Sequence, residues 1–292
     1  LDPFAVWEQV QAAHGLREEL VDGVLIYQTF FTDLIHFATA YATGGNPQVE
    51  GILPPEPERG FEFPRTPNLM HMNQVNFDEN ADERMASVLM LHEFGHRWLY
   101  NVAIAEEGSN STILNPQSFH PAAYVDTRSA FPLYGGEESS VMGGGYFTEI
   151  GQNRFRARTQ QYGFSWTDLY LMGLAAPEEV VPWFYLAGSN PELPKSYFPA
   201  DGIEVTATKK NVSLQQIVEA QGPRNPSSAR SARTFRVLFV LVTEPGKAPT
   251  AEEIAKMNWL RAKMERDFAV VTGGRGSLIT TYMPVAKRRA VR

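Results

Sequence analysis

One stretch of the chain repeats apolar and polar positions at helical spacing more clearly than any other. The residues that share one face between positions 81 and 105 are Met85, Val88, Leu89, His92, His96 and Leu99. Asn80 is the expected N-cap, because Glu83 follows three residues later and can complete a capping box. Gly108 suits the position just after the last turn. The pattern therefore predicts a helix over residues 81–105.

The rest of the chain mixes helical and extended patterns without a regular alternation. Five prolines between Pro54 and Pro67 exclude a regular element there. Helices are predicted over residues 3–20, 34–41, 166–174 and 250–268, and extended segments over 21–31, 68–77, 146–156 (a hairpin), 234–243 and 277–282. This mixture is typical of an α+β fold.

The chemistry of the predicted helix lies in the five residues His92-Glu93-Phe94-Gly95-His96. Positions four apart lie on one helical face, so His92 and His96 can both reach one metal ion. Zinc binds histidine nitrogen at about 2.0–2.1 Å and keeps one position for water in catalytic sites. Glu93, about 100° further around the helix, can take a proton from that water. The alternative is a pair of hydrogen-bonded core histidines beside a surface glutamate.

This motif resembles the active-site helix of the zincin metallopeptidases. The resemblance implies that His92 and His96 bind zinc, that Glu93 is the general base, and that residues 68–77 form a strand that pairs with an extended substrate. It also implies a single zincin-like domain over residues 1–292, with two lobes around a central active-site helix. The first lobe is expected to span about 1–108. The second, about 109–292, would supply the third ligand and a layer of late strands and helix.

A further motif of the zincins is present only in part. In the metzincin group a glycine and a third histidine follow the second histidine at fixed spacing, and Leu99 and Val102 occupy those positions here. Ser140-Val141-Met142-Gly143 nonetheless resembles the Met-turn of that group, which lies under the metal. A glycine-rich turn with a buried methionine would look the same. Met142 is therefore a candidate for the floor of a metal site.

Several residues are candidates for the third ligand. His120 leads, because it is the only histidine after the helix and precedes Met142. Asp168 is next: it is a lone carboxylate in an apolar segment, and it suits either a ligand or an acceptor for a histidine N–H. The remaining candidates are Glu137, Glu138 and Glu149. The segment from His120 to Asp168 is also similar to a group of uncharacterised exported bacterial proteins, which favours treating it as one part of the site.

Other histidines and tyrosines have weaker claims to a role. The histidines expected to be structural are His14, His36 and His71. A hydrolase also needs a donor to the developing oxyanion, and the candidates are Tyr124, Tyr146 and Tyr170.

Composition limits the partners and the compartment that can be expected for this chain. The net charge of −7 argues against a nucleic-acid partner, and the absence of cysteine excludes disulfides and thiolate metal sites. No apolar run approaches the roughly 20 residues that span a bilayer. The chain begins at Leu1 and not at methionine, which favours a removed leader and a secreted or periplasmic protein. The expected cofactor is zinc. The expected partner is a peptide or protein substrate, bound in extended form between the two lobes. An endopeptidase is expected rather than an exopeptidase.

Overall fold

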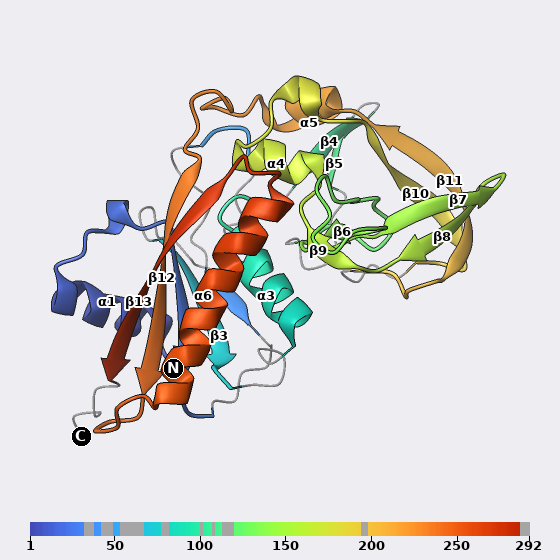
Figure 1. The fold of residues 1–292 in the computed structure, drawn as a ribbon. Helices are drawn as coiled ribbons and strands as arrows, with labels where there is room; N and C mark the ends of the chain where they lie inside the picture. The colour runs from blue at the N-terminus through green and yellow to red at the C-terminus, as the bar shows by residue number, and fades with distance from the viewer. Residues whose placement is uncertain are drawn as a thin grey trace.

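Two sheets organise the chain, one built from its two ends and one from its middle (Figure 1). The computed structural model describes residues 1–31, 38–41, 49–52, 67–76, 82–99, 102–106, 109–112, 120–193 and 198–286. Helices and strands alternate irregularly along these residues, so the predicted α+β class is confirmed at that level.

The larger sheet combines strands from the beginning and the end of the chain. Its order is β13-β12-β1-β3-β2; the outer strand β2 is antiparallel to β3, and the other neighbours are parallel. The strands are β1 (Gly23–Gln28), β2 (Thr39–Tyr41), β3 (Asn68–Gln74), β12 (Thr234–Thr243) and β13 (Ser277–Ala286). All residues of β1 are buried, as expected for a strand with parallel neighbours and covered faces.

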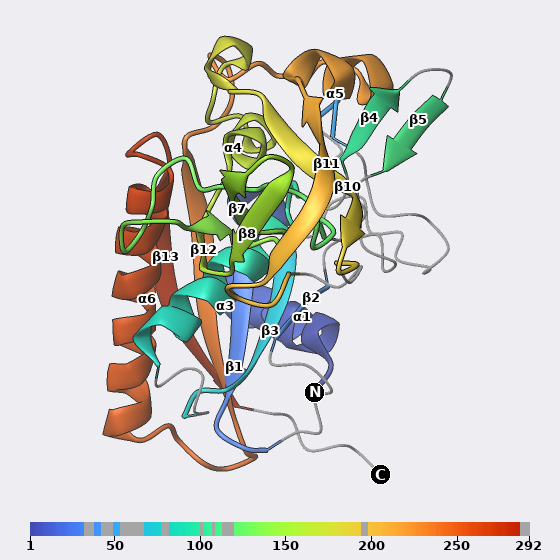
Figure 2. The ribbon, with the colours of Figure 1, turned by 90° about the vertical axis from the view of Figure 1, so that its right-hand side faces the viewer.

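Successive residues of β1 contribute to two different cores, because side chains along a strand alternate between the faces of the sheet. Leu25 belongs to the large core that includes residues of α3 (Glu83–Gly95) and α6 (Ala251–Val271). Val24 belongs to a smaller core with α1 (Pro3–His14). Figures 1 and 2 show α1 on one side of the sheet and α3 and α6 on the other.

The middle of the chain builds the second region. Its antiparallel sheet has the order β10-β11-β8-β7, and its core contains Phe147, Phe155 and Phe184. The elements of this region are β4 (Ala103–Glu106), β5 (Ser109–Thr112), β6 (Ser139–Ser140), β7 (Tyr146–Gly151), β8 (Arg154–Arg158), β9 (Gln161–Gly163), α4 (Trp166–Met172), β10 (Trp183–Asn190), β11 (Glu204–Val212) and α5 (Leu214–Gln221). Short 3-10 helices occur at Glu18–Leu20 and Pro177–Glu179.

Elements with strong local signals lie where the sequence predicts them. The hairpin β7–β8, the short helix α4 and the strand β12 are confirmed, and β12 has the predicted bounds. Helix α6 begins after Thr250, whose hydroxyl accepts from the N–H of Glu253 while the Glu253 carboxylate accepts from the N–H of Thr250. This capping box explains why the start of α6 is readable from sequence.

The helix that carries the two histidines begins later than expected. Asp82 is its N-cap, and one oxygen of its carboxylate accepts from the N–H groups of Arg84 and Met85 at 2.8 and 2.9 Å. These bonds, followed by the charges of Arg84 and Lys263, favour the ionised carboxylate and lower the pKa of Asp82. The predicted cap, Asn80, lies outside the described residues.

The same helix also ends earlier, at Gly95 and not at residue 105. Beyond it, Ala103–Glu106 pairs as β4 with β5. Ile104 is buried against Val212 and Ile217, and Val102 packs against this cluster. The tertiary packing of these two β-branched residues therefore outweighs the helical periodicity that the sequence shows beyond Gly95. The predicted C-cap, Gly108, lies outside the described residues.

Two other predictions near the larger sheet are wrong. Residues 39–41, predicted as the end of a helix, form β2, because a short apolar run lacks a periodicity that separates helix from strand. Residues 34–37 lie outside the described part. Strand β3, which the resemblance implies is open to pairing with an extended substrate, has β1 on one side and β2 on the other over Leu69–His71.

The late strands also lie elsewhere than expected. The expected division into two lobes assigns β12, α6 and β13 to the second lobe, but β12 pairs with β1 along the whole of that strand. Hydrophobic periodicity identifies a strand without naming its neighbour, so this pairing could not be read from sequence.

Candidate metal centre

Three histidines from two parts of the chain converge on one point. His92 and His96 come from α3, and His120 comes from the segment that leads into the second region. The Nε2 atom of His92 lies 3.2 Å from Nε2 of His96 and 3.0 Å from Nε2 of His120. One ligand atom from each ring lies within 4.8 Å of the others. His96 and His120 are buried and His92 is partly buried.

The early end of α3 does not disturb the spacing of its two histidines. His96 is the C-cap residue and keeps right-handed helical angles, with φ −58° and ψ −11°. Its N–H still donates to the carbonyl of His92 at 3.3 Å. The two rings therefore remain one helical turn apart on the same face, as the motif requires.

A hydrogen bond through Nδ1 fixes the orientation of the His92 ring. Its Nδ1 atom lies 2.7 Å from the carbonyl oxygen of Val141, which can only accept, so Nδ1 carries the proton. In the neutral ring, Nε2 then has a free lone pair that faces the other two histidines. A carbonyl in this position is the usual outer partner of a metal-bound histidine.

The spacing of the three nitrogens fits a metal ion better than a hydrogen-bond cluster. Three ligands about 2.05 Å from a tetrahedral ion would lie about 3.3 Å from one another. Each neutral Nε2 is either a donor or an acceptor, so three of them cannot all hydrogen-bond mutually. The chemistry of this donor set, imidazole nitrogen alone, suits zinc and similar transition metals. In the described residues, this group could therefore hold a metal ion.

The electrostatic setting keeps all three rings neutral, which is the form that binds metal. Burial lowers the pKa of His92, although its bond to Val141 partly opposes this. Burial followed by the positive charge of a protonated His92 lowers the pKa of His96 far below its usual value. The pKa of His120 is lowered in the same way, by burial and then by the other two histidines. Neutral imidazoles can bind a cation without first losing a proton.

A buried turn lies against the histidine helix. Met142 is 1% exposed, and a Cβ added to Gly95 would lie 2.7 Å from its Sδ atom. Glycine at this position of the motif thus allows the close approach of Met142 to the helix. The turn also supplies the Val141 carbonyl, so it supports the site both by packing and by a hydrogen bond.

The other candidates for the third ligand are occupied elsewhere. The Asp168 carboxylate accepts from the N–H of Ser165 at 2.7 Å, as part of the capping box of α4. Burial raises the pKa of Asp168, and its interactions with Ser140 and Ser165 partly offset that rise. Glu138 accepts from two backbone N–H groups of its own loop, and burial raises its pKa. Glu137 pairs with Arg158.

Glu149, the last of these candidates, is exposed on β7. Within the described residues, none of the four carboxylates belongs to the three-histidine group.

Glu93 is held with the histidine helix. It is 5% exposed, and its backbone carbonyl accepts from the side-chain amide of Asn68 at 2.8 Å. Asn68 is the first residue of β3, so the centre of the motif is tied to the larger sheet. A carboxylate this well buried is costly to retain unless it has partners or a chemical task.

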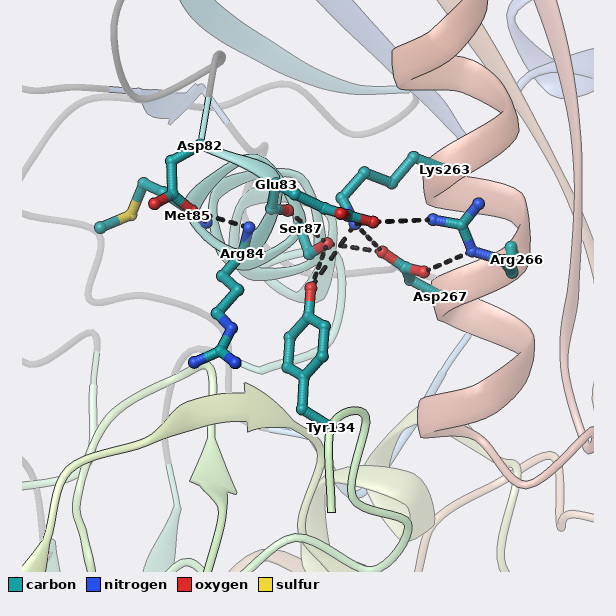
Figure 3. Close-up of polar contacts among 9 residues, drawn as sticks. All are labelled: Asp82, Glu83, Arg84, Met85, Ser87, Tyr134, Lys263, Arg266 and Asp267. Carbon is teal, nitrogen blue, oxygen red and sulfur yellow. Dashed lines mark hydrogen bonds and ion pairs between the residues drawn. The ribbon is translucent and has the colours of Figure 1, made fainter. Parts of the chain in front are cut away.

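A buried charged cluster, which we did not predict, joins α3 to α6 (Figure 3). The Lys263 ammonium lies 2.9 Å from Asp267 and 3.2 Å from Glu83. The Asp267 carboxylate also accepts from the Ser87 hydroxyl at 2.5 Å. Tyr134 reaches the same cluster from the second region, with its hydroxyl 3.5 Å from both Lys263 and Ser87.

A signal for this cluster exists in the sequence. Lys263 and Asp267 lie four residues apart, on the face of α6 that also carries Leu260, Met264 and Phe268. Charged residues inside an apolar helical stripe usually have a buried partner.

In the described part of the chain, no further histidine belongs to the metal group, and the three tyrosine candidates contact other residues. His71 is buried in β3, its Nε2 atom lies 2.6 Å from the Gln28 side-chain oxygen, and burial lowers its pKa to about 4. His14 ends α1, and His36 lies outside the described residues. The Tyr170 hydroxyl accepts from the N–H of Arg224, and the Tyr146 ring lies under Arg128. The Tyr124 ring lies 6.3 Å from that of Tyr185.

Comparison with known proteins adds no assignment: no protein-family model matches the chain, and no curated protein or solved structure matches it significantly. The site must therefore be interpreted from its own geometry.

Proposed function

We propose that this protein is a zinc-dependent hydrolase that cleaves peptide bonds, with His92, His96 and His120 as zinc ligands and Glu93 as general base. The observation that carries the proposal is the convergence of three neutral imidazole nitrogens, two of them flanking a glutamate in the same helix. A structural zinc site normally closes all four positions with protein ligands. Three histidine ligands, two of which flank a glutamate in the sequence of one helix, fit an open, catalytic position better.

Each group of the chain has a defined task in this proposal. Zinc, when bound, supplies Lewis acidity that polarises a carbonyl and makes water a better nucleophile at neutral pH. Glu93 takes the proton from the attacking water and delivers it to the leaving amine nitrogen. The C–O bond forms first, the C–N bond then breaks as the nitrogen takes the proton, and the Glu93 carboxylate is regenerated. The Val141 carbonyl holds the His92 ring in place throughout.

The substrate class in the proposal is a peptide or protein, cut internally. No described helix is long and apolar enough to cross a membrane. The net charge of −7 would repel the phosphates of a nucleic acid.

Metal content and hydrolysis measured on the same variants test the proposal. We expect about one zinc per chain by mass spectrometry in the wild type and in Glu93→Gln, because Glu93 is not a ligand. His92→Ala and His120→Ala should lose the metal, whereas Asp168→Asn should still bind zinc. On a peptide library, Glu93→Gln should cleave roughly 10²–10⁴-fold more slowly than the wild type.

Each other outcome has a definite meaning. Zinc binding without hydrolysis of any substrate by the wild type would identify a non-catalytic zinc-containing binding protein. Hydrolysis confined to esters or small amides would retain the mechanism and reject the peptide substrate. A folded wild type with no zinc above background after zinc loading would reject the metal site itself.

A further inference from the structure

The last turn of α3 is attached to the larger sheet by hydrogen bonds on both sides of His96. We infer that Asn68 and Arg97 are positioning residues, which fix the backbone carrying Glu93 and His96 against one end of that sheet. The inference rests on the proposed zinc site, because it concerns how the helix with two of its ligands is held.

The first attachment is at the backbone carbonyl of Glu93. In a continuing α-helix this carbonyl would accept from the N–H of Arg97, four residues later. The N–H of Arg97 donates to the carbonyl of Phe94 instead, at 3.1 Å, because the chain tightens where α3 ends. The side-chain amide of Asn68 donates to the Glu93 carbonyl at 2.8 Å. Asn68, which is 2% exposed, thus supplies the partner that the end of a helix lacks.

The second attachment is the side chain of Arg97, immediately after His96. Its Nη1 atom donates to the backbone carbonyl of Asp22 at 2.8 Å, and its Nη2 atom donates to the Asp22 carboxylate at 2.9 Å. The two side chains are 20% and 26% exposed. Two bonds from one planar guanidinium to one residue fix both the distance and the direction of the contact, which a lysine cannot reproduce.

Both attachments lead to the same end of the larger sheet. The N–H of Asp22 donates to the carbonyl of Arg236, and the second oxygen of its carboxylate accepts from the N–H of Arg236, both at 2.8 Å. The carbonyl of Asp22 also accepts from the N–H of Asn68, at 3.2 Å. Asp22 precedes β1, Asn68 begins β3 and Arg236 lies in β12, and these three strands are neighbours. The end of α3 is therefore bonded to a rigid, hydrogen-bonded base.

The consequence concerns the distance between α3 and the third histidine. His120 comes from another part of the chain, so its fit to His92 and His96 depends on where the end of α3 lies. A metal or catalytic site must be held within about 0.5 Å of its working geometry. Apolar packing is not directional, whereas hydrogen bonds are. The two attachments therefore keep the metal-binding end of α3 at the position that His120 requires.

Two variants and a matched control test this role by zinc affinity. Arg97→Lys and Asn68→Asp remove the directional bonds with little change in size. In a competition titration against a chromogenic zinc chelator, we expect each to weaken zinc binding by roughly 10–100-fold. Arg275→Lys is the control, because Arg275 makes the same kind of fork, to the Glu179 carboxylate at 2.6 and 2.8 Å and to the Leu174 carbonyl at 3.3 Å. Both of these partners lie outside α3, so the control should stay within about threefold of the wild type.

A spectroscopic readout separates positioning from general stability. With cobalt(II) bound at saturation in place of zinc, the visible absorption bands report the coordination geometry. The bands should shift in Arg97→Lys and Asn68→Asp and stay unchanged in Arg275→Lys. A role confined to stability would leave all the saturated spectra alike. Unchanged bands together with unchanged zinc affinity in Arg97→Lys would overturn the inference, even if Asn68→Asp failed to fold.

Amide hydrogen exchange in the zinc-free protein tests the attachments without any metal. The backbone N–H groups of residues 96 and 97 should exchange at least about tenfold faster in Arg97→Lys and Asn68→Asp than in the wild type. The N–H of Met90, in the middle of α3, should keep its rate and serves as the internal reference. Equal exchange in all variants would overturn the inference. A wild type that binds no zinc but shows these local changes would reject the proposed function and leave the attachment of α3 standing.

Discussion

The turn under the histidines depends on a residue without a side chain. Gly144 has φ +73°, and a Cβ there would lie 2.6 Å from the Val125 carbonyl oxygen, which is backbone and cannot move aside. Gly135 has a similar φ of +83° but nothing within 4 Å of the added atom. The two positions share the conformational cost of a left-handed residue, but Gly144 is buried in close contact with its neighbours and Gly135 is exposed.

This pair allows the contact to be measured. Gly135→Ala should lower the free energy of unfolding by about 1–2 kcal/mol, the cost of a left-handed alanine. Gly144→Ala should cost roughly 1–3 kcal/mol more, because the backbone around it must shift. Chemical denaturation of the zinc-free protein gives both values. Equal losses in the two variants would show that the close approach to Val125 has no energetic weight.

Residues of the candidate site could be predicted where metal binding requires a fixed spacing in the sequence. The positions of His92, Glu93 and His96 follow from helical geometry, and the structure brings His120 to His92 and His96. The bond between His92 and the Val141 carbonyl could not be predicted, because the turn that supplies it lies 49 residues further along the chain.

Among the secondary elements, the position of α3 is set by two kinds of contact with α6. The rings of Phe94 and Phe268 lie 5.7 Å apart, and the charged cluster of Lys263, Asp267 and Ser87 lies nearer the start of α3. The aromatic contact between Phe94 and Phe268 contributes stability but would allow α3 to shift along α6. A buried ion pair with directional bonds fixes one register, at a cost in desolvation.

Removing one member of the ion pair should therefore be worse than removing both. The side chains of Lys263 and Asp267 are 1% and 4% exposed. Lys263→Met leaves the buried Asp267 carboxylate with only the Ser87 hydroxyl and the largely exposed Arg266 as side-chain partners among the described residues, and should lower the free energy of unfolding by about 3–5 kcal/mol. The double variant Lys263→Met with Asp267→Leu should recover most of that loss. Denaturant unfolding of the zinc-free variants measures both.

An exposed member of the same cluster provides the control. The side chain of Arg266 is 57% exposed, so Arg266→Ala should cost less than about 1 kcal/mol. If the double variant were as unstable as Lys263→Met alone, the two buried charges would not be coupled, and the cluster could not set the register of α3.

The elements themselves were predictable where local signals agree. Strand β12 and helix α6 have strong periodicity, and α6 has a capping box, so their bounds were nearly right. The end of α3 was wrong because the helical pattern continued past Gly95 while Val102 and Ile104 found partners in another core. Sequence periodicity indicates a preference for helix or strand. Where the two preferences are of similar strength, tertiary packing decides which one forms.

For the molecule as a whole, the three histidines and the scaffold that holds them come from different ends of the chain. All six histidines of the sequence lie in its first 120 residues. Yet β13 pairs with β12 along ten residues, and α6 covers the histidine helix. The sequence alone placed these late elements in the second lobe, because nothing local indicates that β12 lies beside β1.

Division of the chain at the exposed turn that contains Gly246 tests this dependence. The fragment 1–246 retains every histidine and Glu93, and the fragment 247–292 contains no histidine. Without α6 and β13, the fragment 1–246 should bind zinc at least about 100-fold more weakly than the full chain, because the buried faces of α3 and β12 lose their cover. Adding the fragment 247–292 should restore binding in a concentration-dependent manner, because association stabilises the folded form by mass action. Zinc titration of the fragments, separate and mixed, measures this. Full affinity in the fragment 1–246 alone would show that the metal centre is formed without the strands and helix that complete its sheet.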